Sequence, residues 1–172
     1  MSLYITVLCC ALFLSLVEVD GRLLVHASAA TILHGAATVG TGRSSIVTYE
    51  LRRDGFVYVT ADDKIQGRGA NFSTVHVQWR GGELLVNADA SHSANDSVRV
   101  AVLHETTGVA VPGYEAVNSL AFVGKNETAQ VWSWGGGRHT MSSLVGKAIR
   151  LEVALAGGAR LYSLRGKFDS GS

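Results

Sequence analysis

The stretch IRLEVALAGGARLYSLRG, residues 149–166, carries the pattern on which the fold assignment rests. Its first half places apolar side chains at every second position, namely Ile149, Leu151, Val153 and Leu155. Successive side chains of a β-strand point to opposite faces, so a period of two predicts a strand with one buried face. Gly157 and Gly158 follow directly and are typical of a two-residue turn, which needs positive φ. We therefore expect two strands joined as a hairpin.

The same alternation recurs along the chain, with turn residues between the segments. Period-two apolar positions occur at Val75, Val77 and Trp79, and again at Val98, Val100 and Val102. Gly81-Gly82 divides TVHVQWR from ELLVNADA, and Asp54-Gly55 divides IVTYELRR from FVYVTA. Each of these pairs predicts a further hairpin. Many such strands bury their apolar faces most simply in two packed sheets, so the sequence predicts an all-β protein.

The composition is that of one folded domain without a charge bias. The chain has 172 residues, of which 47% are hydrophobic and 17% charged, and its net charge is +1. A chain of this length supports one domain with a substantial core. A near-neutral charge gives no electrostatic attraction toward nucleic acid, which is therefore not an expected partner. The 20 glycines and single proline fit tight turns between strands better than a low-complexity chain.

The N-terminus has the character of a targeting segment. Leu3 to Val17 contains no charged residue, but it is shorter than a membrane span, which needs about 20 residues. We therefore treat residues 1–17 as signal-peptide-like and expect a secreted protein that touches a membrane only if this segment stays uncleaved. Two features oppose this interpretation: no Lys or Arg precedes the run, and it continues into VEVDGRLLVHAS without an obvious cleavage site. A mis-started gene product, in which the run replaces part of a lost strand, is a further alternative.

Two other features agree with a secretory route. Both cysteines, Cys9 and Cys10, lie inside the apolar run, so a chain without that run has no disulfide. Three N-x-S/T sequons without a central proline predict N-glycosylation at Asn71, Asn95 and Asn126. Each of the three lies near a predicted strand end or loop, where glycosylated asparagines are found.

No arrangement of side chains in the sequence points to catalysis, a metal or a cofactor. Asp62-Asp63 is the only adjacent acidic pair, and neighbouring strand residues point opposite ways, so solvated loop charge explains it better than acid–base chemistry. The six histidines show no HxH or HxxxH spacing. The GxSxG, P-loop and GxGxxG motifs are absent. We therefore predict a protein that is not an enzyme and has no metal site and no cofactor.

The aromatic side chains provide one candidate binding site. Trp132 and Trp134 are two residues apart and share a strand face. An exposed pair of this kind can stack on the apolar face of a sugar ring, and Tyr114 completes the candidate carbohydrate-binding set. The alternative is that Trp134 fills the core, and it is the favoured one because large aromatic side chains supply much of a core's buried area. Trp79, which alternates with apolar neighbours, is expected in the core.

A series of short motifs resembles one protein family. The matching positions are Arg53-Asp54-Gly55-Phe56, Leu84 to Ala88, Pro112-Gly113-Tyr114, Trp134-Gly135-Gly136, Leu144, Gly146-Lys147, Arg150-Leu151 and Leu161-Tyr162-Ser163, with His34-Gly35 upstream. Together they are similar to the C-terminal β-sandwich, and the last propeller strands before it, of five-bladed β-propeller proteins in the group around glycoside hydrolase families 32 and 43. The resemblance covers about residues 18–166.

This resemblance implies an antiparallel, jelly-roll-like β-sandwich at residues 53–168, preceded by a β-hairpin-like segment at residues 18–52 that resembles the last propeller strands. In that family the catalytic carboxylates lie on earlier blades, and glycoside hydrolysis needs two such groups. The resemblance therefore implies a non-catalytic accessory module that packs against a propeller or binds glycan weakly. The alternative is an independently secreted, lectin-like carbohydrate-binding protein. An open reading frame for propeller blades upstream of Met1 would distinguish the two hypotheses.

The hairpin-like segment is expected to be the less stable part. Leu24, Ile46, Thr48 and Glu50 give it only a thin apolar face, and an isolated two-stranded ribbon is marginally stable in water. We therefore expect residues 18–52 to be more mobile than residues 56–167.

Overall fold

The computed structural model describes residues 13–20, 22–30, 44–61 and 69–170. Within these ranges the elements are ten β-strands and three short 3-10 helices, and every strand pairing is antiparallel. The predicted all-β class is therefore confirmed. The chain divides into two compact units, Met1–Arg53 and Asp54–Ser172.

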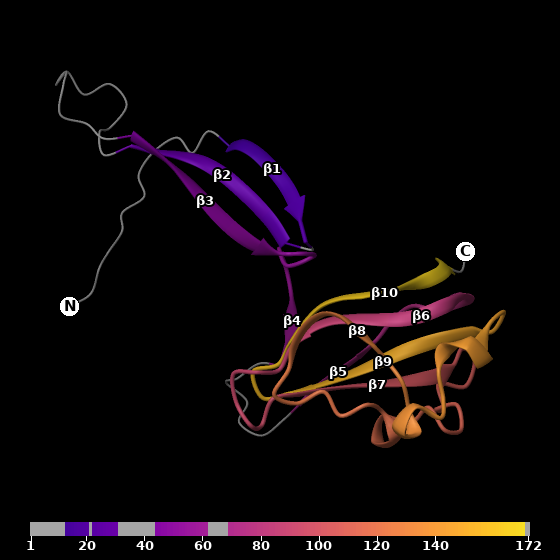
Figure 1. Ribbon diagram of the computed structural model, residues 1–172. Coiled ribbons are helices and arrows are strands. Elements are labelled where there is room, and N and C mark those ends of the chain that lie inside the picture. Colours follow the sequence, from indigo (N-terminus) through magenta and orange to yellow (C-terminus); the bar gives the residue numbers. More distant parts are fainter. Residues whose placement is uncertain (1–12, 21, 31–43, 62–68, 171–172) are drawn as a thin grey trace. The chain divides into compact units, whose positions relative to one another are not determined.

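The first unit is a three-stranded antiparallel sheet (Figure 1). Its strands are β1 (Phe13–Val19), β2 (Arg22–Ala30) and β3 (Ser44–Arg52), in the order β1-β2-β3. Asp20 lies between the first two strands with a φ of 50°, a conformation that suits a tight hairpin turn. β1 overlaps the signal-peptide-like segment 1–17, of which residues 1–12 lie outside the described ranges, and the signal interpretation stays a prediction.

The strand register gives this sheet one apolar and one mixed face, because directly opposed residues share a face. The apolar face carries the row Leu16–Val25–Tyr49, the pair Ala27–Val47 and the row Glu18–Leu23–Leu51, in which Glu18 is the one charged residue. Only Val25 and Ala27 are buried there, whereas Leu16 is 61% and Tyr49 48% exposed. The residues from which a thin apolar face was expected lie on the opposite, mixed face: Leu24, Ile46, Thr48 and Glu50. The apolar face is therefore broader than expected, because strand pairing forms it from the odd-numbered residues of β2 and β3 and not from the even-numbered ones.

The second unit is a seven-stranded antiparallel sheet with three 3-10 helices in its connections (Figure 1). Its strands are β4 (Val59–Thr60), β5 (Ala70–Ser73), β6 (Val77–Asp89), β7 (Ser97–His104), β8 (Asn126–Val131), β9 (Ala148–Ala156) and β10 (Arg160–Ser170). The helices are η1 (Ala116–Asn118), η2 (Gly135–Gly137) and η3 (Met141–Leu144). The main path runs β4-β10-β6-β9-β5, with β8 paired to β6 and β7 paired to β9.

The sheet bends at β6, which places two strand groups face to face. Along β6 one edge pairs with β10, while the other edge pairs with β8 at its C-terminal half and with β9 through only two residue pairs, Val77↔Ile149 and Gln78↔Ala148. One layer therefore contains β4, β10, β6 and β8, and the other contains β5, β9 and β7. This nearly closed arrangement is the predicted antiparallel β-sandwich.

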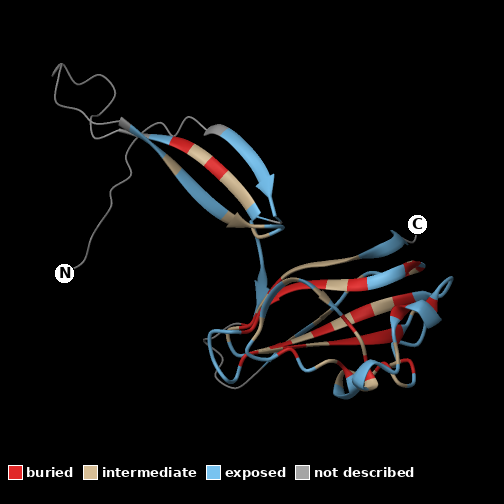
Figure 2. Cartoon of the chain, viewed as in Figure 1, coloured by how far each residue is buried: buried red, intermediate tan, exposed pale blue. Residues whose placement is uncertain are grey.

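Alternating apolar residues from both layers form the core, as Figure 2 shows along β6, β7 and β9. Every second residue of β9 is buried, from Ile149 to Leu155, and Trp79 is 0% exposed. The period-two prediction is therefore confirmed for these strands. It is wrong at Val75, which precedes β6 and is 73% exposed.

The three predicted hairpins are wrong. Each of the predicted turn pairs, Asp54-Gly55, Gly81-Gly82 and Gly157-Gly158, nevertheless contains a residue with positive φ. Gly81 and Gly82 have φ values of 123° and 79°, but they lie inside the continuous strand β6. The pairing of β6 with β10 shifts register around Lys167, opposite Gly81, so the pair forms a bulge that bends one strand instead of joining two.

The other two pairs connect strands that do not bond to each other. Gly157-Gly158 joins β9 to β10, which lie in different layers and pair with other strands. Asp54-Gly55 follows β3 and precedes β4, which pairs with β10. Positive φ is required both by hairpin turns and by crossovers and bulges, so the residue types alone do not choose between them.

Candidate functional site

The three aromatic residues proposed to stack on sugar are core residues, which corrects that prediction. Trp134 is 0%, Trp132 1% and Tyr114 4% exposed. Their polar atoms are satisfied inside the fold, since Trp134 Nε1 donates to the Val100 carbonyl at 2.7 Å and Trp132 Nε1 donates to Ser119 Oγ at 3.0 Å. The Tyr114 hydroxyl donates to the Thr140 carbonyl at 2.8 Å. None of the rings presents a face to a ligand, so the core alternative is the correct one.

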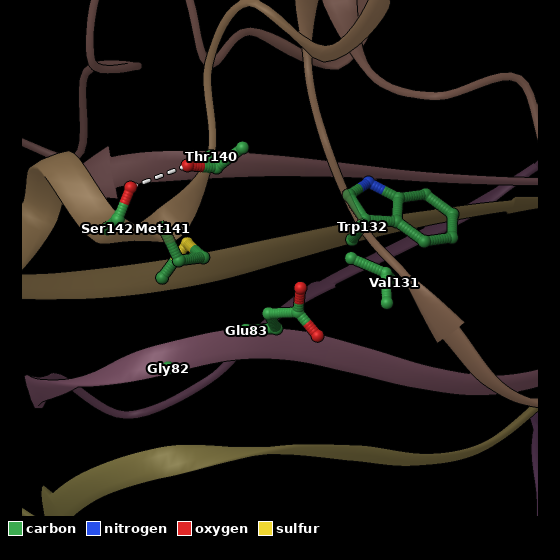
Figure 3. A pocket seen from close by; sticks show the side chains of 7 residues that line it. All are labelled: Gly82, Glu83, Val131, Trp132, Thr140, Met141 and Ser142. Carbon is green, nitrogen blue, oxygen red and sulfur yellow. Dashed lines mark hydrogen bonds between the residues drawn. The ribbon is translucent and has the colours of Figure 1, made fainter.

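Trp132 nevertheless lines a surface hollow of about 290 Å³. Figure 3 shows the side chains around this hollow, with Thr140 and Ser142 on one side and Val131 with Trp132 on the other. The complete lining is Gly82, Glu83, Val131, Trp132, Thr140, Met141 and Ser142. We call this the Glu83 hollow.

Three elements of the sandwich build the Glu83 hollow. Gly82 is part of the bulge in β6, where its φ of 79° redirects the strand, and Glu83 follows it. Val131 and Trp132 come from the end of β8 and its continuation, where Trp132 N donates to the Leu84 carbonyl at 2.9 Å. The third side is the start of η3, whose N-cap is Thr140.

The chemistry of the Glu83 hollow is amphipathic. Its floor is apolar and consists of Trp132 and Met141, each of which is only 1% exposed. Val131 forms a partly exposed apolar wall. Its polar groups are the Glu83 carboxylate and the Thr140 and Ser142 hydroxyls, which bond to each other at 2.7 Å. Among the described residues, Glu83 has no hydrogen-bond or ion-pair partner within bonding distance. The hollow therefore offers acceptors beside a small apolar surface.

The sequence prediction missed Glu83, Thr140 and Ser142. Glu83 enters that prediction only as the first residue of the expected strand ELLVNADA. No local spacing relates a residue of β6 to one 57 positions later, since their proximity depends on the bulge at Gly82 and on where η3 packs.

The buried carboxylates serve the architecture of the loops. Asp96 is 0% exposed and accepts the Ser93 amide at 3.0 Å and the Gly158 amide at 2.8 Å. Asp89 is 6% exposed and accepts the Ser91 amide at 3.0 Å and Asn126 Nδ2 at 3.1 Å. These groups are hydrogen-bonded as buried carboxylates must be. The adjacent pair Asp62-Asp63 lies outside the described residues.

Two groups of the second unit have displaced pKa values. Backbone hydrogen bonding at Glu115 and a bond from Asn118 Nδ2 at 2.6 Å lower the pKa of the Glu115 carboxyl. A hydrogen bond to Tyr162 raises the pKa of Arg160, whose guanidinium lies 4.9 Å from the centroid of the Tyr58 ring. Neither group lines the Glu83 hollow.

The part of the chain that the structure describes holds neither a metal-binding cluster nor a membrane-spanning helix. There, no group of three or more His, Cys, Asp or Glu residues is placed to hold a metal ion. No helix in the same ranges is long and apolar enough to cross a membrane.

The three sequons lie on the surface of the second unit. Asn71 is an exposed residue of β5, and Asn95 is exposed in the connection before β7. Asn126 begins β8 and is also exposed, but its Nδ2 atom, the atom that carries an N-glycan, donates to Asp89. Glycosylation at the three positions remains a prediction.

Comparisons of the chain with protein-family models, curated proteins and solved structures found no match. No match links the chain to families 32 and 43, so that resemblance stays a prediction from the short motifs. Several of these motifs are core and turn residues in the structure: Trp134 is buried, and Gly113 and Gly146 have positive φ.

Proposed function

We propose that this chain is a non-catalytic carbohydrate-recognition module, of the kind that accompanies glycoside-hydrolase-like proteins. One observation carries the proposal: the Glu83 hollow combines hydrogen-bond acceptors with an apolar floor on a rigid sandwich. Secretion belongs to the same proposal, since the signal-peptide-like run and three sequons favour a route to extracellular glycans.

A sugar unit matches the groups of the hollow. Its hydroxyls can donate to the two oxygens of Glu83, which accept only, and can exchange hydrogen bonds with Thr140 and Ser142. Its C–H face can lie against Val131, the apolar side chain of the lining that is 41% exposed. The volume of about 290 Å³ lies at the lower end of small-molecule pockets, which suits one sugar unit.

Binding should be weak, because the aromatic contact is small. Trp132 is 1% exposed, so the ring stacking that strengthens many sugar sites is missing. We expect a Kd of about 1 mM for a short oligosaccharide, equivalent to about −4 kcal/mol.

Isothermal titration with oligosaccharides of several compositions tests this proposal. Glu83→Ala should abolish measurable binding, whereas Glu105→Ala, an acidic residue outside the hollow, should leave it unchanged. The saccharides should be recovered intact, because the module is proposed to recognise glycan without hydrolysing it. Equal binding by both variants, or turnover abolished by one Asp or Glu substitution, would refute the assignment.

A second candidate function is packing against a partner domain, and the apolar face of the first unit favours it. Leu16, Leu23, Tyr49 and Leu51 share this face with Val25, and a three-stranded sheet with one apolar face gains stability when that face is covered. In the resembling family the partner is a β-propeller.

Sedimentation of the chain with a separately produced propeller domain of that family tests the packing candidate. Tyr49→Ser on the apolar face should weaken the complex, and Ile46→Ser on the opposite face, where Ile46 is 71% exposed, should not. Absence of a complex at high concentration would refute this candidate.

A further inference from the structure

We infer that the Glu83 hollow selects a sugar unit that carries a primary ammonium group, that is, an amino sugar. The inference deepens the proposed function and rests on it. The observation behind it is the juxtaposition of one unpaired carboxylate with two hydroxyls over an apolar floor.

Among the described residues that line the hollow, Glu83 is the only charged one. Among the described side chains no ion pair involves it, so its charge is free to attract a ligand cation. One lysine lies close to the rim: Lys167 pairs with Gly81, and its methylene carbons would lie 3.8 Å from a Cβ placed on Gly82. Its ammonium makes no ion pair with a described carboxylate. Lys167 therefore makes the electrostatic potential at the hollow less negative, but it does not form an ion pair with Glu83.

An ammonium group also satisfies the hydroxyl groups of the hollow. It has three donors and no acceptor. The Glu83 carboxylate can accept a hydrogen bond from one of the ammonium N–H groups. The Thr140 and Ser142 oxygens share one hydrogen bond of 2.7 Å and retain lone pairs that can accept hydrogen bonds from the other two. The ring carbons of the sugar then lie against Val131, which is 41% exposed.

The same charge discriminates among sugars. A uronic acid brings a carboxylate toward Glu83 and is repelled. An N-acetylated amino sugar is neutral and retains only the hydroxyl contacts. The expected order of affinity is therefore amino sugar, then N-acetylated or neutral sugar, then uronic acid.

Three tetrasaccharides test the inference: β-1,4-linked glucosamine, its fully N-acetylated form and a β-1,4-linked uronate. Isothermal titration at mildly acidic pH and low salt should give about fivefold tighter binding of the glucosamine oligomer than of the N-acetylated one, a ratio typical of an exposed ion pair. Added salt should reduce this ratio.

Two variants make the result specific. Glu83→Gln should remove the preference while leaving binding of the N-acetylated oligomer, and Glu105→Gln, outside the hollow, should keep the preference. Circular dichroism checks that both variants are folded. Equal affinity for the two oligomers in the unaltered chain, or an undiminished preference in Glu83→Gln, overturns the inference but leaves the proposed function. Failure of all three saccharides to bind overturns both.

Discussion

Replacing Gly157 by alanine should destabilise the sandwich far more than the same replacement at Gly108. Both glycines have left-handed backbones, with φ of 61° and 65°. A non-glycine residue costs roughly 1–2 kcal/mol in this conformation, so both variants share that penalty. They differ in their surroundings: a Cβ at Gly108 meets nothing within 4 Å, whereas one at Gly157 overlaps Asp96 Oδ1 and lies 3.0 Å from the Asn95 carbonyl.

The additional cost at Gly157 follows from the bonds of Asp96. This buried carboxylate accepts the Ser93 and Gly158 amides, and the new methyl group must displace the oxygen that accepts Gly158. Loss of one charged hydrogen bond costs about 1.5–3 kcal/mol. We therefore expect a loss of about 3 kcal/mol or more for Gly157→Ala and about 1 kcal/mol for Gly108→Ala.

Urea unfolding of the two variants and the unaltered chain, followed by tryptophan fluorescence, measures this difference. The burial of all three tryptophans in the second unit makes the signal specific for that unit. A thermal scan should show the Gly157→Ala midpoint roughly 8 °C below that of Gly108→Ala. If the two variants are equally stable, Asp96 does not hold the β9–β10 crossover as described.

Three further predictions concern the surface and the two units. In a eukaryotic secretory host, mass spectrometry should find Asn71 and Asn95 glycosylated and Asn126 less occupied, because its Nδ2 atom is bonded to Asp89; unchanged gel mobility after glycosidase treatment would contradict this. Amides of residues 46–51 should exchange with deuterium faster than those of residues 149–155, since β9 is buried in the core and β3 is largely exposed; equally slow exchange would show that the first sheet is an integral part of the stable fold. Asn118→Ala should raise the pKa of Glu115 toward its ordinary value, seen by carboxyl NMR, because one bond to the charged form is lost. A lowered pKa stabilises the fold above the unfolded-state value and loses that effect as pH falls through the folded value, so the variant should also be less sensitive to mild acid; an unchanged Glu115 titration would contradict the cause.

The strands of the core were predictable because burial imposes a local pattern. Val98, Val100 and Val102 alternate in sequence and are all 0% exposed in β7. The connections between strands were not predictable from the same patterns. Gly81-Gly82 and Gly157-Gly158 have the residue types of hairpin turns, yet one pair bends β6 and the other crosses between layers. Which role a positive-φ residue takes depends on long-range pairing with β10, and no local signal encodes that pairing.

The candidate site was predicted only in part. The alternation of Trp132 and Trp134 correctly indicated that both side chains share one environment, but the two residues follow β8 and both point into the core. Two tryptophans two residues apart have the same spacing whether they face a core or a binding surface. The sequence alone therefore does not show whether their side chains point inward or outward. The polar groups of the hollow come from positions 83, 140 and 142 and meet only through tertiary packing.

Methyl NMR of Met141 tests the central claim most directly. The chain has two methionines, Met1 and Met141, and Met141 is part of the floor of the Glu83 hollow. In a chain labelled with ¹³C-methyl methionine, titration with the glucosamine tetrasaccharide to roughly ten times a Kd of about 1 mM should shift the Met141 signal along a saturable curve. Glu83→Ala should suppress the Met141 shift, whereas Glu105→Ala, outside the hollow, should keep it. A Met141 signal that does not move over this range, or that moves equally in Glu83→Ala, would contradict carbohydrate recognition at this hollow.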